Sequence, residues 1–108
     1  MSLFHHRNII ELIGVCTHSS VWVVMELAAL GELRQYLQRE QHSINLSLQL
    51  LFSQELASAV AYLHSLKFVH CDIAARNVLV SSSRCVKLSD FGLSRLLGDD
   101  LIYTCRFF

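Results

Sequence analysis

The chain has 108 residues, and nine Lys and Arg residues balance nine Asp and Glu residues, so its formal net charge is zero. A chain of this length forms one domain at most, and the balanced charge argues against a nucleic-acid-binding surface. It contains no proline and only four glycines, while 53% of its residues are hydrophobic. This composition excludes a disordered or linker-rich polypeptide and indicates a globular one.

The cysteines and histidines give no sign of a disulfide framework or a metal centre. The four cysteines are far apart and form no CxxC pair, and no signal peptide precedes them: Cys16, Cys71, Cys85 and Cys105. This pattern favours a reduced, cytoplasmic setting, and no histidine stands at a metal-ligand spacing. The longest apolar run, residues 21–30, contains Glu26 and is too short for a membrane span.

The first predicted elements are two strands. Residues 9–15 (IIELIGV) and 21–25 (VWVVM) are rich in β-branched and aromatic side chains, and a polar turn at 17–20 separates them. They predict an adjacent antiparallel pair. Because two strands cannot cover their own edges and faces, we expect further elements upstream of this chain.

Two helices are predicted next. Residues 32–39 combine good helix formers with leucines four positions apart. Residues 46–66 have apolar side chains at spacings of three and four, which predicts one apolar face: Leu48, Phe52, Leu56, Ala59, Val60 and Leu63. Asn45 precedes this run and is expected to cap the helix.

A polar octet, HCDIAARN at 70–77, interrupts apolar sequence after the second helix. Residues 78–80 and 85–88 predict a hairpin around the turn 81–84, and SDFG follows at 89–92. Taken alone, Asp72 would most simply be a cap or turn residue. Since a hairpin returns the chain close to its start, however, we expect Asp90 to lie near Asp72 and Asn77.

Such a cluster of oxygen-bearing side chains suggests a function in phosphate chemistry. Mg²⁺ prefers hard oxygen ligands and is commonly held by one or two side chains together with phosphate oxygens. Asn77 and Asp90 suit that role, which leaves Asp72 to accept a proton from an attacking hydroxyl group.

These segments resemble protein kinases. HCDIAARN resembles the kinase catalytic loop HRDLxxxN, and SDFG resembles the metal-binding DFG motif. The insert at 74–76 (AAR) is similar to that of tyrosine kinases, and VWVVMELAALGELRQYLQ is similar to the focal adhesion kinase group. The resemblance covers residues 4–103.

The resemblance implies an α+β fragment of the bilobal protein-kinase fold. Residues 1–27 would be the remainder of the N-lobe up to the hinge, residues 28–103 the upper C-lobe, and residues 104–108 an atypical tail. It also implies ATP-dependent phosphoryl transfer, with Mg²⁺, to the acceptor tyrosine of a protein substrate. Adhesion or signalling partners would act through domains outside this chain.

The resemblance also implies roles for individual residues. Asp72, Arg76 and Asn77 would be catalytic, with Arg76 seating the substrate tyrosine. The nucleotide would meet Met25 as gatekeeper, the backbone of Glu26 and Ala28 at the adenine edge, Glu32 near the ribose and Leu79 beneath the adenine. His70 is expected to brace the DFG turn through its backbone, a structural role.

Departures from the family's pattern leave a second interpretation open. The Gly-rich loop, the ATP-anchoring lysine and its partner glutamate are absent, and the only lysines, Lys67 and Lys87, align elsewhere. Cys71 stands where the family usually has an arginine that pairs with a phosphorylated activation loop, and Tyr103 lies where the loop tyrosine would be. The chain can therefore also be a non-catalytic, truncated or pseudokinase-like fragment, and we expect the 108 residues alone to be inactive.

Overall fold

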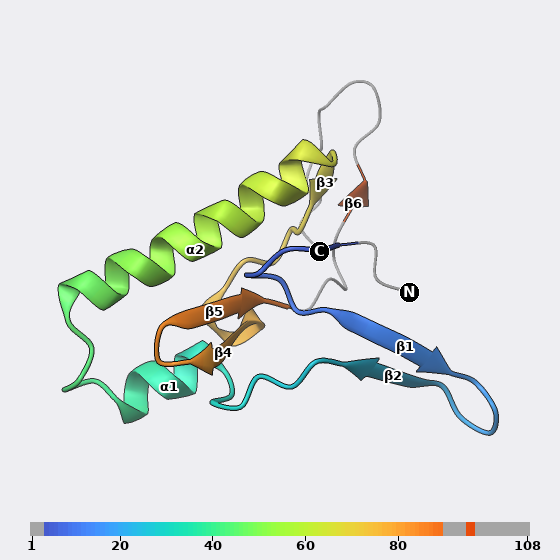
Figure 1. Cartoon of the computed structure of the whole chain (residues 1–108), viewed down its shortest axis with the longest axis horizontal. Coiled ribbons are helices and arrows are strands. Elements are labelled where there is room, and N and C mark those ends of the chain that lie inside the picture. Colours follow the sequence, from blue (N-terminus) through green and yellow to red (C-terminus); the bar gives the residue numbers. More distant parts are fainter. Residues whose placement is uncertain (1–3, 90–94, 97–108) are drawn as a thin grey trace, which may run out of the picture.

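The computed structural model of the chain describes residues 4–89 and 95–96 (Figure 1). The elements combine two α-helices with three two-stranded antiparallel sheets, as expected for an α+β fragment. In chain order they are β1 (Leu12–Cys16), β2 (Trp22–Met25), α1 (Leu33–Arg39), α2 (Leu46–Ser65), β3 (Phe68–Val69), the 3₁₀ turn η1 (Ala75–Asn77), β4 (Val78–Ser82), β5 (Cys85–Leu88) and β6 (Arg95–Leu96).

Strands β1 and β2 form the predicted antiparallel ribbon, which projects from the rest of the fold (Figure 1). The register pairs Leu12 with Met25 and Cys16 with Trp22, and it shifts between Leu12 and Gly14. Every residue of β2 is exposed, and the side chain of Trp22 is 65% exposed. The expectation that this ribbon cannot bury its own apolar side chains is therefore confirmed.

The long helix α2 begins at the predicted residue, Leu46, and ends at Ser65, one residue before the predicted end. The side chain of Asn45 accepts a hydrogen bond of 2.9 Å from the backbone N–H of Leu48, so the predicted cap is confirmed. Phe52, Ala59 and Leu63 are buried on one face, which packs against β5. The other three predicted apolar positions, Leu48, Leu56 and Val60, are partly buried against the same core.

The β4–β5 hairpin lies between the two helices, with α2 against β5 and α1 against β4 (Figure 1). Its inward side chains are fully buried: Val78, Val80, Val86 and Leu88. The strand predicted from residue 9 begins only at Leu12, which corrects that boundary. Ile9 and Ile10 are instead buried beside Leu88, because the backbone of residues 8–10 exchanges hydrogen bonds of 2.7 and 3.0 Å with Leu88.

The remaining elements are short. Strand β3 pairs antiparallel with β6, a pairing that the sequence did not predict. In the described part of the chain no helix is both long enough and apolar enough to cross a membrane. The three cysteines of that part are free thiols: Cys16, Cys71 and Cys85.

Candidate active site

The carboxylate of Asp72 is held by two side chains of the same loop. Arg76 donates to Oδ1 at 2.7 Å, and the amide of Asn77 donates to Oδ2 at 2.9 Å. Asn77 also donates to the backbone C=O of Asp72 at 2.9 Å. Both carboxylate oxygens are thus bound to donors, one of them cationic, and these contacts fix the orientation of the carboxylate. A carboxylate oriented in this way is placed as a general base would be.

Local backbone geometry brings these three residues together. Residues 75–77 form the 3₁₀ turn η1, in which the N–H of Asn77 donates to the C=O of Ala74 at 2.9 Å. This turn folds Arg76 and Asn77 back over Asp72. Asn77 is buried, whereas the side chains of Arg76 and Asp72 are 56% and 26% exposed. The carboxylate is therefore held by the buried Asn77 and by Arg76, and it remains accessible to a substrate from the solvent side.

The imidazole of His70 connects this loop to the end of β5. Its Nδ1 accepts from the N–H of Asp72 at 3.1 Å, so the proton is assigned to Nε2, which donates to the C=O of Ser89 at 2.7 Å. Ser89 in turn donates to the C=O of Asn77, at 2.8 Å from its N–H and 2.9 Å from its hydroxyl group. His70 thus braces the start of the SDFG segment, through its ring and the backbone of Ser89.

The predicted convergence is observed for two of its three residues. Asp72 and Asn77 are in contact, and Ser89 lies beside Asn77. Asp90 follows Ser89 directly, but it lies outside the described residues, and so does Tyr103. The orientation assigned to the Asn77 amide turns Nδ2 toward Asp72, which leaves its Oδ1 as the atom that suits a hard cation.

Cys71, between His70 and Asp72, has a left-handed backbone conformation with a φ of 70°. For a residue with a Cβ atom this conformation costs about 1–2 kcal/mol. The thiol is half-buried and donates to the C=O of Val69 at 3.7 Å. The side chain thus points back toward Val69, the last residue of β3.

The segment after β2, which is predicted to contact adenine, is anchored to β4 by backbone bonds. The N–H of Leu30 donates to the C=O of Val80 at 2.9 Å, and the N–H of Val80 donates to the C=O of Gly31 at 2.7 Å. Gly31 has a φ of 79°, which a glycine adopts without strain. Glu32 and Leu79 form an antiparallel bridge. The structure therefore brings the ribose and adenine candidates next to each other.

Two backbone groups of this segment are available to a ligand. Within the described residues, neither the C=O of Glu26 nor the N–H of Ala28 takes part in a backbone hydrogen bond. These are the two groups predicted to meet the adenine edge. Met25 is exposed. Leu79 is half-buried and directly precedes Val80, the residue bonded to Leu30 and Gly31. One acceptor and one donor in this segment fit a planar base that carries one hydrogen-bond donor and one acceptor along an edge.

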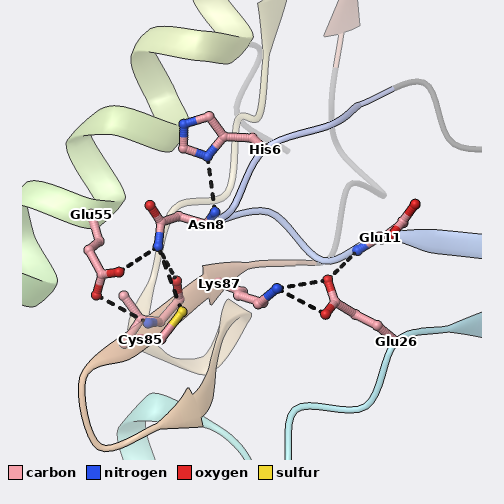
Figure 2. Close-up of polar contacts among 8 residues, drawn as sticks. His6, Asn8, Glu11, Glu26, Glu55, Cys85 and Lys87 are labelled. Atoms are coloured by element: carbon pink, nitrogen blue, oxygen red, sulfur yellow. Dashed lines mark hydrogen bonds and ion pairs between the residues drawn. The ribbon is translucent and has the colours of Figure 1, made fainter.

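An ion pair that the sequence did not predict lies beside this segment. Lys87 of β5 contacts both carboxylate oxygens of Glu26, at 2.9 and 3.1 Å (Figure 2). Glu26 also accepts from the N–H of Glu11 at 2.8 Å. Burial raises the pKa of Glu26, but the hydrogen bonds from Lys87 and Glu11 and the charge of Lys87 outweigh it, so this pKa lies below its usual value. In the sequence, the sign of such an ion pair was a charged residue, Lys87, between the two apolar residues Val86 and Leu88.

A second unpredicted contact ties the start of the chain to α2. The side-chain amide of Asn8 donates to Glu55 at 2.7 Å and to the C=O of Val86 at 2.9 Å (Figure 2). Glu55 also accepts from the N–H of Val86 at 3.3 Å. Both side chains are buried. An acidic residue three positions after Phe52, on an apolar helix face, was a sign that such a partner exists.

Similarity to known proteins extends over nearly the whole chain. Residues 1–106 match the family described as protein tyrosine and serine/threonine kinase. The chain is 55% identical over 104 residues to "Inactive tyrosine-protein kinase kin-32" of Caenorhabditis elegans, which covers 96% of the chain and 12% of that protein. It is 39% identical over 102 residues to "Tyrosine-protein kinase abl-1" of the same organism, which covers 93% of the chain and 8% of that protein. The chain thus spans only a small part of these curated relatives.

Proposed function

Because this chain belongs to the protein tyrosine and serine/threonine kinase family, we propose that it is the central segment of a tyrosine kinase of the focal adhesion kinase type. The parent protein would transfer the γ-phosphoryl group of ATP to a tyrosine hydroxyl group of a protein substrate. The observation that carries the proposal is the Asp72 carboxylate, held by Arg76 and Asn77 in the manner that a proton acceptor requires.

We assign the following roles to the residues of this chain. Asp72 orients the acceptor hydroxyl group and accepts its proton, while Asn77 holds Asp72 in place. Arg76 is more than half exposed, and besides binding Asp72 it can contact a tyrosine ring or its hydroxyl group. Such positioning, together with charge stabilisation, accounts for most of the catalysis in phosphoryl transfer.

The residues present also fit the nucleotide and its metal. ATP with Mg²⁺ would supply the transferable phosphoryl group and the charge that stabilises it. Asn77 through Oδ1, with Asp90, would hold the Mg²⁺ ion. The adenine would meet the free C=O of Glu26 and N–H of Ala28, with Met25 beside it. Leu79 would lie beneath the base, and Glu32 near the ribose.

The domain organisation follows the same proposal. Residues 1–27 would complete the N-lobe, residues 28–103 would form the upper C-lobe, and residues 104–108 would be a divergent tail. We place the parent protein in the cytoplasm, where free thiols persist, and we expect its adhesion or signalling partners to bind through other domains.

A non-catalytic role is the second candidate, and two observations favour it. The relative that is 55% identical to the chain is named an inactive tyrosine-protein kinase. Cys71 occupies the position next to Asp72 that carries an arginine in the resembling kinases, and a cysteine side chain lacks the guanidinium cation of arginine. On this interpretation the segment would bind a nucleotide or a partner without transferring phosphate.

A chimera separates the two candidates. Residues 1–106 would replace the matching segment of the abl-1 kinase domain, which supplies the remaining elements. ADP affinity measured by calorimetry reports binding, and phosphorylation of a tyrosine peptide reports transfer. Binding together with transfer supports the kinase, provided that Asp72→Asn removes the transfer. Binding without transfer supports the non-catalytic candidate, and loss of both in a folded chimera contradicts the proposed nucleotide site.

A further inference from the structure

Glu26 extends the hydrogen-bonded ladder of β1 and β2 by one further pair, which it forms with Glu11. The N–H of Glu26 donates to the C=O of Glu11 at 3.0 Å, and the Glu26 carboxylate accepts from the N–H of Glu11 at 2.8 Å. Both backbone groups of Glu11 are therefore satisfied by one residue, although the strands are assigned only from Leu12 and up to Met25. The position of the Glu26 side chain thus determines how the chain leaves β2.

Lys87 fixes that side chain from a different part of the fold. Its ammonium group contacts both oxygens of Glu26, and the side chains of Lys87 and Glu26 are only 15% and 27% exposed (Figure 2). Within the described residues, Glu26 is the only ion-pair partner of Lys87. The pair joins the end of β2 to β5, across 61 residues of sequence.

The segment between the two anchors is short. At one end Glu26 is held by Lys87 of β5, and at the other end Leu30 and Gly31 are bonded to Val80 of β4. Only residues 27–29 lie between these anchors, and they include the free N–H of Ala28. Both anchors belong to the same buried hairpin, so a single rigid element holds the segment at both ends.

The register of that hairpin places Lys87 beside the proposed adenine site. Leu79 and Lys87 are directly opposite each other in the β4–β5 ladder. Directly opposed residues of an antiparallel pair project from the same face of the sheet. Lys87 therefore projects from the face that carries Leu79, the residue proposed to lie beneath the adenine.

We propose that Lys87 is a positioning residue for the nucleotide: it holds the Glu26 carboxylate so that the Glu26 C=O and the Ala28 N–H face the adenine edge together. This inference rests on the proposed function. Without Lys87, Glu26 is free to rotate, the extra pair with Glu11 weakens, and the two groups lose their common orientation before the nucleotide binds. Preorganisation of this kind raises affinity by lowering the ordering cost of binding.

The test compares Lys87→Met and Glu26→Gln with a matched control in the abl-1 chimera. Lys67→Met is that control, because Lys67 is the only other lysine of the chain and its backbone N–H bonds to His64, far from the segment 26–31 in sequence. ADP dissociation constants and peptide KM values are measured for each variant. Hydrogen exchange of the Glu26 and Leu30 amides is followed in the chimera and in the full 108-residue chain.

We expect Lys87→Met and Glu26→Gln each to raise the ADP dissociation constant about twofold to fivefold, the range of a partly shielded ion pair. The double variant should bind no more weakly than Lys87→Met alone, because the two residues act as one unit. The peptide KM should not change. The Glu26 amide should exchange faster, while the Leu30 amide, bonded to β4, should not.

Two outcomes would overturn the inference and can be told apart. If the unaltered chimera binds ADP and Lys87→Met binds it equally or more tightly, Lys87 does not position the segment. If the unaltered chimera is folded and binds no nucleotide, the proposed function fails, and the inference fails with it. Lys87→Arg should retain most of the affinity, since it keeps a cation within reach of Glu26.

Discussion

The side-chain amide of Asn77 donates two hydrogen bonds of 2.9 Å to Asp72, one to its backbone C=O and one to its carboxylate. The residue proposed to hold the metal thus also orients the residue proposed to accept the proton. A buried amide that bonds both ends of one residue permits little rotation of either side chain. Substitution of Asn77 should therefore affect both the metal site and the orientation of Asp72, whereas substitution of Asp72 should affect the proton acceptor alone.

Asp72→Asn should leave ADP affinity of the chimera unchanged while it lowers phosphoryl transfer about 10²- to 10⁴-fold, the usual range for a general base. Single-turnover phosphorylation of a tyrosine peptide measures the effect. Asp90→Asn, which removes a proposed Mg²⁺ ligand, should abolish activity, and Glu40→Gln, at the C-cap of α1 and outside the proposed site, should not change transfer. Unimpaired transfer by Asp72→Asn would refute the assignment of Asp72.

Tyr103→Phe should have little effect on activity while Cys71 is present. A short side chain without a guanidinium group, pointing back to Val69, cannot pair with a phosphorylated loop as arginine would. Cys71→Arg should create that dependence by supplying a bidentate partner for the phosphate. The assay is peptide phosphorylation by the chimera, with and without Tyr103→Phe in both backgrounds. A large Tyr103→Phe loss with Cys71 in place would show that another cation orders the loop.

The Glu26–Lys87 pair should stabilise the fold at neutral pH and not in acid. The pKa of Glu26 is lower in the folded state than its usual value of 4.5. The unfolded chain therefore binds the proton more readily, so the stabilisation is present above about pH 4.5 and is lost as the pH falls through the folded-state pKa. Measured by urea unfolding at pH 7, the free energy of unfolding should differ by up to about 1 kcal/mol between wild type and Glu26→Gln. That difference should vanish once the pH lies below the folded-state pKa of Glu26, and a pH-independent difference would exclude this explanation.

Asn45→Ala should lower the free energy of unfolding by about 1 kcal/mol, because the N–H of Leu48 loses its acceptor at the start of α2. Urea unfolding of the chimera, followed by circular dichroism, measures the loss. Asn45→Asp is the matched control, since it retains an oxygen acceptor at the same position. Equal losses in both variants would show that the cap contributes nothing to stability.

The 108-residue chain by itself should associate in solution through the β1–β2 ribbon. Exposed apolar side chains lie on both strands of this ribbon, and Trp22 is the only tryptophan of the chain: Ile13, Val15, Trp22, Val23, Val24 and Met25. Trp22 fluorescence should shift to longer wavelength on dilution, and Trp22→Ser with Val23→Thr should lower the sedimentation coefficient. The control Leu50→Ser, at an exposed site on α2, should not. A monomeric wild-type chain with sharp, dispersed amide signals would contradict this prediction.

Local sequence predicted most of the helices and hairpins. The spacing of Phe52, Ala59 and Leu63 defines a helix face whatever lies against it, and Asn45 satisfies a backbone group three residues away. The hairpin from 78 to 88 likewise depends on neighbouring residues. The boundary of β1 was less predictable, because Ile9 and Ile10 fit a strand equally well. Their place beside Leu88 depends on a residue far along the chain.

The sequence by itself determined both α-helices, the β1–β2 and β4–β5 hairpins, the amphipathic face of α2 and the motif that contains Asp72 and Asn77, because these depend on neighbours within a few residues. Only the tertiary structure decided which distant side chains meet. Glu26 and Lys87 are 61 positions apart, and Asn8 and Glu55 are 47 positions apart. A charged or amide side chain near the core requires a partner, but several candidates satisfy that requirement equally well in the sequence. The choice is made when α2, β5 and residues 8–11 pack together, since only that arrangement brings the partners within hydrogen-bonding distance.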